Sequence, residues 1–245
     1  MSMLTLVRRR GRQFASWKYL PVLILSVILL FALICLFVRK PGIALIFLCY
    51  AIILFESRIN LRRFIRGVPG ASTLVTVLRS AFFFLPLPFL GVPHFLFFSW
   101  GILAGVLFGY LLHIWQWRDL QLQFSSEFLA LLPPLSREEK FNGTLQRVLA
   151  GIAQEYFYRG VMLTALLGSI GWGAVAIAAL LFALEHFMHR DWQQVFDWVD
   201  LVLQTLLGLG LGVILVLSSS LAGCMLGHIA YNSVDIFRAL RRKTC

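Results

Sequence analysis

The second half of the chain carries three short groups of polar and ionisable residues within apolar stretches. They are Gln154-Glu155-Tyr156-Phe157-Tyr158-Arg159, Phe182-Ala183-Leu184-Glu185-His186 and His228-Ile229-Ala230-Tyr231-Asn232. Carboxylate, imidazole and amide side chains can transfer protons, bind a metal ion or hydrogen-bond one helix to another. Because ionisable groups are costly inside a membrane-spanning helix, each group is a candidate functional site.

The spacing of these residues predicts which side chains share a helix face. Glu155 and Arg159 are four residues apart, with the acid N-terminal to the base, which is the favourable order for an ion pair. Gln154 lies one residue earlier, about 100° around the helix, and is expected to point elsewhere. His228 and Asn232 are also four apart. Taken singly, the groups equally fit a buried ion pair, an interfacial histidine in the second group, and hydrogen bonds between helices in the third.

The composition predicts a polytopic, all-α membrane protein. Of 245 residues, 60% are hydrophobic and 13% are charged, where a soluble domain carries roughly 25% charged residues. Apolar runs near the length that crosses a bilayer recur along the chain. About eight transmembrane helices are predicted, at about 20–38, 41–55, 72–90, 94–114, 144–168, 170–188, 195–217 and 219–238. The second is short and the third is interrupted by Arg79 and two prolines, so either can be tilted or re-entrant. Residues 115–142 are predicted to lie outside the membrane, partly along its surface.

The basic residues predict the orientation. Lys and Arg outnumber Asp and Glu by 22 to 11, but they cluster between apolar runs, which is typical of cytoplasmic loops and not of nucleic-acid binding. With eight spans, 17 of the 22 are cytoplasmic when both termini are inside. At 1.5 Å per residue, Glu155 and His228 then lie roughly 15 Å inside the cytoplasmic face, with His186 nearer to it. The three helices can therefore form one cavity that faces the cytoplasm.

The three groups resemble the motifs E-E-x-x-x-R, F-x-x-x-H and H-x-x-x-N of the CAAX-protease and bacteriocin-processing family. This family is also called the Abi family and includes the type II CAAX prenyl endopeptidases. The resemblance covers roughly residues 144–237. It implies a glutamate-type intramembrane endopeptidase with no cofactor and no metal, acting on a membrane-associated protein or peptide. The division into an N-terminal half, 1–143, and a helical core of catalytic type, 144–245, follows from where the motifs lie.

The resemblance also implies a role for each residue of the motifs. Position 154 and His186 would activate a water molecule, and His228 and Asn232 would stabilise the oxyanion. Glu155 would also lie at the site and would form a structural ion pair with Arg159. Phe182 would have a structural role at the site.

The chain departs from the family pattern at one position. Gln154 stands where the family has its first glutamate, and an amide cannot accept the proton of water. An inactive endopeptidase is therefore expected. Three explanations of Gln154 are open: an engineered glutamate-to-glutamine change, a natural variant that uses Glu155 as base, and a non-catalytic membrane scaffold or regulator.

Two other catalytic chemistries, those of a zinc metalloprotease and of a cysteine nucleophile, are compatible with parts of the sequence. His186, His228 and a carboxylate can ligate zinc, although no H-E-x-x-H helix is present. Cys224 shares a face with His228, but a buried thiol is usually a packing residue. A transporter is not favoured, since no broken-helix pair recurs in two halves. The expected location is a bacterial inner membrane, where the chain contacts the lipid bilayer.

Overall fold

The computed structural model describes residues 20–56, 70–90, 99–189 and 198–245, and it confirms the all-α class. The helices are α2 (Leu20–Phe37), α3 (Pro41–Glu56), α5 (Ala71–Phe82), α6 (Leu87–Leu90), α7 (Trp100–Leu111), η2 (Ile114–Gln116), α8 (Trp117–Gln123), α9 (Ser126–Leu131), α10 (Arg137–Glu155), η3 (Tyr156–Leu163), α11 (Thr164–Ile170), α12 (Gly173–His189), α13 (Trp198–Ser218) and α14 (Leu221–Arg241). No strand occurs in these ranges.

Helices lie in all eight predicted ranges, as far as the structure describes them. Within the described residues, three segments are long and apolar enough to span a bilayer: Leu20–Phe37, Ala71–Leu90 and Trp198–Ser218. Three more helices, α3, α7 and α12, are apolar but shorter. The predicted start of the fourth range, 94–98, and that of the seventh, 195–197, lie outside the described residues.

The helix that contains the start of the fifth predicted range extends beyond it at the N-terminal end. The helix begins at Arg137 and not near residue 144, so residues 137–142 are helical and not part of a loop. A capping box explains the earlier start, because Ser136 Oγ accepts from the backbone N–H of Glu139 at 3.1 Å and Glu139 returns a bond to the Ser136 N–H at 2.7 Å. The rest of the predicted surface region forms the short helices α8 and α9.

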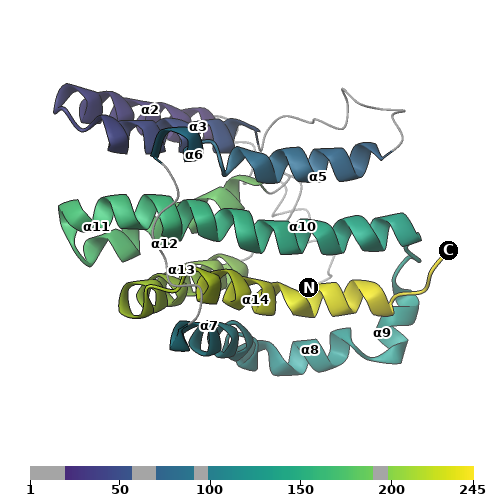
Figure 1. The fold of residues 1–245 in the computed structure, drawn as a ribbon. Helices are drawn as coiled ribbons and strands as arrows, with labels where there is room; N and C mark the ends of the chain where they lie inside the picture. The colour runs from purple at the N-terminus through teal and green to yellow at the C-terminus, as the bar shows by residue number, and fades with distance from the viewer. Residues whose placement is uncertain (1–19, 57–69, 91–98, 190–197) are drawn as a thin grey trace, which may run out of the picture.

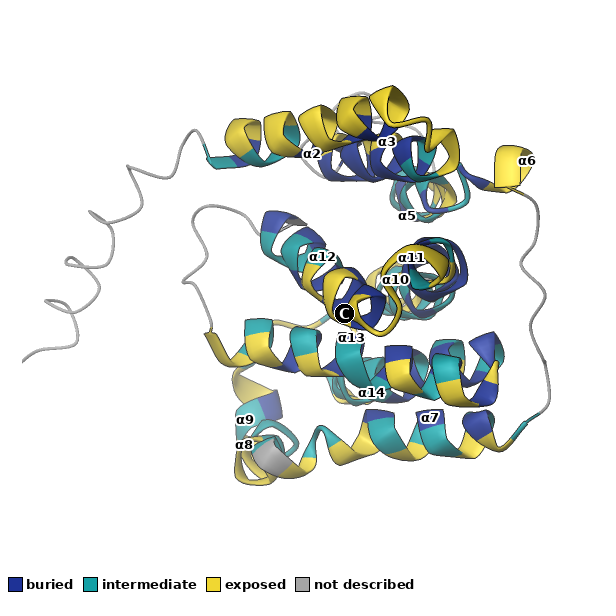
Figure 2. Ribbon diagram, turned by 90° about the vertical axis from the view of Figure 1, so that its left-hand side faces the viewer, coloured by how far each residue is buried: buried dark blue, intermediate teal, exposed yellow. Residues whose placement is uncertain are grey.

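The helices lie roughly side by side in layers (Figure 1). Helices α2, α3 and α5 form one outer layer, α10, α11 and α12 lie in the middle, and α13 and α14 separate them from α7. Figure 2 shows that α2 is exposed over most of its surface, whereas α3 beneath it is largely buried. The middle layer carries the first and second motifs and packs against α14, which carries the third.

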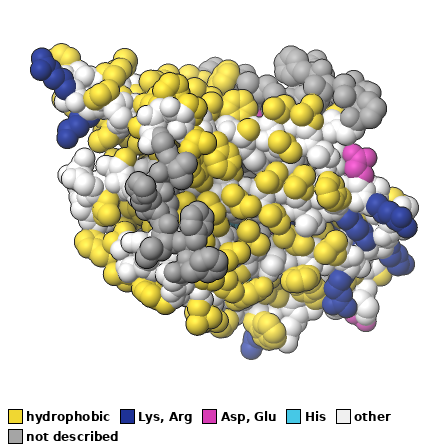
Figure 3. Space-filling model, in the orientation of Figure 1, with side chains coloured by type: hydrophobic (Ala, Val, Ile, Leu, Met, Phe, Trp, Pro, Cys, Tyr) yellow, Lys and Arg dark blue, Asp and Glu magenta, His cyan; other side chains and the backbone are white. Residues whose placement is uncertain are grey.

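Apolar side chains cover much of the visible surface, as a membrane protein requires (Figure 3). Basic side chains gather at the two ends of the helices (Figure 3). One end is the α2–α3 turn with Arg39 and Lys40, and the other is where α10 begins and α14 ends. The basic segments at 8–18 and 58–66, and Arg190, on which the predicted orientation also depends, lie outside the described residues.

Glycines bring α7 and α14 into backbone contact. A Cβ atom added to Gly105 would lie 2.0 Å from the carbonyl oxygen of Gly223, and one added to Gly227 would lie 2.6 Å from that of Gly105. Gly101 and Gly109 extend the row by one turn on either side. Such small-residue rows let membrane helices approach closely. The close contact fixes the backbone of α14 directly beside His228.

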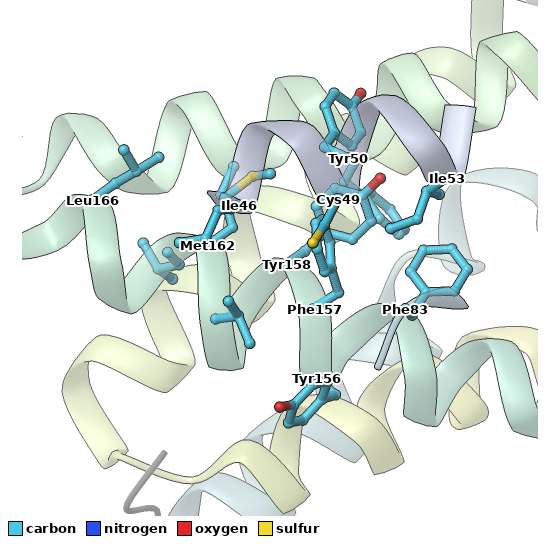
Figure 4. Close-up of a cluster of buried hydrophobic side chains, with 14 of the residues drawn as sticks. Ile46, Cys49, Tyr50, Ile53, Phe83, Tyr156, Phe157, Tyr158, Met162 and Leu166 are labelled. Atoms are coloured by element: carbon cyan, nitrogen blue, oxygen red, sulfur yellow. The ribbon is translucent and has the colours of Figure 1, made fainter. Parts of the chain in front are cut away.

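The helix that carries the first motif changes from α to π geometry directly after Glu155. The π-helical segment η3 places three consecutive aromatic residues, Tyr156, Phe157 and Tyr158, in the interior. Figure 4 shows Phe157 and Tyr158 near Tyr50 of α3 and Phe83, with Tyr156 farther from these two rings. The Phe157 ring lies 6.1 Å from that of Phe83, and the Tyr158 ring 6.1 Å from that of Tyr50. This apolar cluster anchors the segment that holds Arg159.

Candidate active site

Glu155 joins the first motif to the third. One carboxylate oxygen lies 3.1 Å from Nε of Arg159, and the other lies 2.8 Å from Nδ1 of His228. All three side chains are essentially inaccessible to solvent. Because a carboxylate can only accept, Nδ1 of His228 must carry a hydrogen. Glu155 therefore has two cationic or hydrogen-bonding partners, one on its own helix and one on α14.

Phe182 joins the second motif to both of the others. Its ring centroid lies 4.4 Å from the His186 ring and 5.6 Å from the His228 ring. The guanidinium carbon of Arg159 lies 4.6 Å from the same ring, over its face, which is the geometry of a cation–π contact. One buried phenyl ring thus contacts a residue from each of the three motifs.

Gln154 and Glu155, although adjacent, contact different helices. The Gln154 side-chain nitrogen donates to Oε2 of Glu185 on α12 at 2.8 Å, and both residues are buried. The same Oε2 lies 3.2 Å from Nδ1 of His186, which is also 3.1 Å from the Phe182 carbonyl oxygen. This geometry agrees with the expectation that Gln154 points away from Glu155. The Gln154 side chain contacts α12.

Asn232 lies one turn beyond His228 and has a separate contact. Its Nδ2 donates to the backbone carbonyl of Arg147 on α10 at 3.1 Å. This bond ties α14 to α10, as expected if the third motif holds helices together. Cys224 is also buried, and its thiol donates to the Leu211 carbonyl at 3.2 Å. Within the described residues, no three His, Cys, Asp or Glu side chains are grouped as metal ligands.

Glu185 is the site residue that sequence reasoning missed. In the second motif it occupies one of the three unspecified positions between the phenylalanine and the histidine. The available signal was its type, since a carboxylate inside an apolar helix requires polar partners, and these can lie on another helix. That partner, Gln154, is 31 residues away, so no local spacing rule would have found it.

The fold and the site define a helical membrane protein with carboxylate and histidine side chains buried among α10, α12 and α14. Residues 139–234 match the family model described as Type II CAAX prenyl endopeptidase Rce1-like. This stretch contains all three motifs, and it confirms the resemblance to the CAAX-protease and bacteriocin-processing family, a family of proteases. Together with the apolar helices, the match indicates an integral membrane protein. No curated protein and no solved structure matches the chain.

Proposed function

We propose that this protein is an intramembrane endopeptidase that hydrolyses a peptide bond in a membrane-associated protein or peptide. The observation that carries the proposal is the convergence of the three motifs around Phe182, with two buried carboxylates, Glu155 and Glu185, each beside a histidine. One carboxylate–histidine pair can act as a general base and the other as a hydrogen-bond donor to the oxyanion. These are the two requirements of amide hydrolysis by water.

In this proposal His228 and Asn232 bind the oxyanion. Glu155 holds Nδ1–H of His228, so a protonated ring presents Nε2–H as the donor. The Asn232 amide has two N–H groups, one of which is fixed on the Arg147 carbonyl, and the second is the proposed oxyanion donor. Arg159 neutralises Glu155 and is structural, and no cofactor is required. The expected setting is a bacterial inner membrane with both termini in the cytoplasm.

Gln154 favours a second candidate, a non-catalytic scaffold or regulator that binds another membrane protein. An amide at this position cannot take a proton from water. The two functions differ in a simple assay with the purified chain in liposomes and a set of membrane-anchored and prenylated peptide reporters. The endopeptidase predicts cleavage that His228→Ala abolishes. Stable capture of a membrane-anchored reporter without cleavage, at any enzyme concentration, would instead support the scaffold.

A further inference from the structure

The family motifs imply no role for the Glu185 carboxylate. It is nevertheless among the most buried charged groups in the described residues. Its side chain is 0% exposed, whereas that of the adjacent His186 is 25% exposed. A fully buried carboxylate needs donors that keep it in place. Gln154 supplies one from α10, and the Nδ1 position of His186 supplies another.

The surroundings of Nδ1 fix the tautomer of His186. Nδ1 lies 3.2 Å from Glu185 Oε2 and 3.1 Å from the Phe182 carbonyl oxygen, and both oxygens only accept. The hydrogen must therefore be on Nδ1, and in the neutral ring Nε2 has the lone pair. The imidazole is the partly exposed member of the pair, so a water molecule can approach the ring more readily than the carboxylate.

We propose that His186 is the general base of this chain, and that Glu185 and Gln154 are the positioning residues that make it so. The inference rests on the proposed endopeptidase function. Nε2 of His186 takes a proton from water as the water oxygen bonds to the scissile carbonyl carbon, whose π electrons move to the carbonyl oxygen. Glu185 holds Nδ1–H and stabilises the imidazolium. When the C–N bond breaks, Nε2 returns the proton to the leaving amine, which closes the balance for hydrolysis.

Gln154 is then a required donor and not a disabled base. A glutamate at position 154 would bring a second carboxylate oxygen to about the 2.8 Å now spanned by the amide bond to Glu185. Two buried carboxylates at that distance cannot both be ionised. The two carboxylates would share one proton, and the negative charge on Glu185 that stabilises the imidazolium would be reduced. If His186 on α12 is the base, the amide at position 154 does not make the chain inactive.

The test compares four forms of the full chain in liposomes on a cleaved reporter: wild type, Glu185→Gln, Gln154→Glu and His186→Gln. Glu185→Gln keeps its volume and its acceptor for Gln154, so we expect unchanged melting and KM, with kcat lowered by about 10²–10⁴-fold. Gln154→Glu should also lower kcat. Because Glu185 acts through His186, the double variant Glu185→Gln/His186→Gln should be no slower than His186→Gln alone. A gain of rate in Gln154→Glu with full activity in Glu185→Gln would overturn the proposal.

A second readout does not need turnover. The ¹⁵N shifts of histidine-labelled protein report which ring nitrogen carries hydrogen, and we expect the Nδ1–H form for His186 in the wild type and a mixture in Glu185→Gln. An Nε2–H form in the wild type would overturn the positioning role even if kinetics were ambiguous. If the wild-type chain cleaves no reporter, both the proposed endopeptidase function and the assignment of His186 as base are rejected. If the wild type and Glu185→Gln are both active, only the assignment of the base is rejected.

Discussion

A buried carboxylate oxygen of Glu155 lies 2.8 Å from Nδ1 of His228, 73 residues later in the chain. This contact joins α10 to α14 at the point where η3 begins, and the other oxygen of the same carboxylate faces Arg159. Loss of either partner would leave a buried charge without its partner, so we expect the packing of α10 against α14 to depend on both contacts.

Arg159→Ala should destabilise the fold before it affects chemistry. Removing one member of a buried ion pair leaves the other charge unpaired, which typically costs about 3–5 kcal/mol. Arg159 is also the cation over the Phe182 ring. The measurement is thermal melting in detergent. Arg147→Ala is the matched control, because Arg147 is half-exposed and its 3.7 Å contact with Asp235 is that of a weak surface pair. An Arg159→Ala melting curve that overlaps with the control would contradict the structural role.

Asn232→Ala should reduce turnover more than stability. The lost bond to the Arg147 carbonyl costs about 0.5–1.5 kcal/mol of folding free energy, while a lost oxyanion donor lowers kcat roughly 100-fold. Steady-state kinetics and melting separate the two effects. Ser233→Ala, on the next residue, removes a hydroxyl that donates to the Ala230 carbonyl and lies 3.4 Å from the Tyr110 hydroxyl, and it should leave kcat unchanged. If Asn232→Ala melts earlier but cleaves at the wild-type rate, Asn232 only joins the helices.

Gly105→Ala should separate α7 from α14. The new methyl carbon would lie 2.0 Å from a backbone oxygen of Gly223, which cannot move without displacing the helix that carries His228. We expect a clear loss of melting temperature and of reporter cleavage. Gly168→Ala adds the same methyl group where no atom lies within 4 Å, and in a helix it should be neutral or slightly stabilising. Equal melting of the two variants would show that the close packing of the glycines is not needed.

The capping box of α10 should be pH-dependent. Hydrogen bonds from the backbone and side chain of Ser136 lower the pKa of the Glu139 carboxyl, which lies outside the proposed spans. Because the pKa of Glu139 is lower in the folded state, its carboxylate stabilises the helix start at pH values above the unfolded pKa. This stabilisation is lost as the pH falls through the folded pKa. Amide exchange at residues 137–143 should be faster in Glu139→Gln than in wild type at neutral pH. The difference should vanish in acid; a difference that persists there would rule out the carboxylate as its cause.

The native cysteines offer a test of orientation. Cys245 is exposed, whereas Cys35, Cys49 and Cys224 are buried. With both termini in the cytoplasm, a thiol reagent that cannot cross membranes should label Cys245 only after the cells are opened. Arg39→Cys in a Cys245→Ser background places a thiol at the opposite end of the helices and should react in intact cells. The reverse pattern would invert the topology.

The sequence predicted the helical class and the approximate position of each long helix, because apolar runs separated by Gly, Pro and basic residues are local signals. It also predicted the Glu155–Arg159 pair, which depends only on spacing along one helix. It did not predict the Gln154–Glu185 contact or the glycine row between α7 and α14. Both join segments far apart in the chain, so their partners are set by tertiary packing and not by local pattern.

The π-helical segment has a consequence for how this chain compares in length with its relatives. A π turn holds one more residue than an α turn, so the eight residues of η3 rotate everything after Glu155 relative to a continuous α-helix. A relative that keeps the same site with an ordinary helix here would have one residue fewer between its acidic pair and the following turn. Conversely, deleting a single residue from 160–163 in this chain should convert the π segment to an ordinary α-helix and leave both the acidic pair and α11 in place. The π-helical segment thus holds one additional residue between the motif and the rest of its helix.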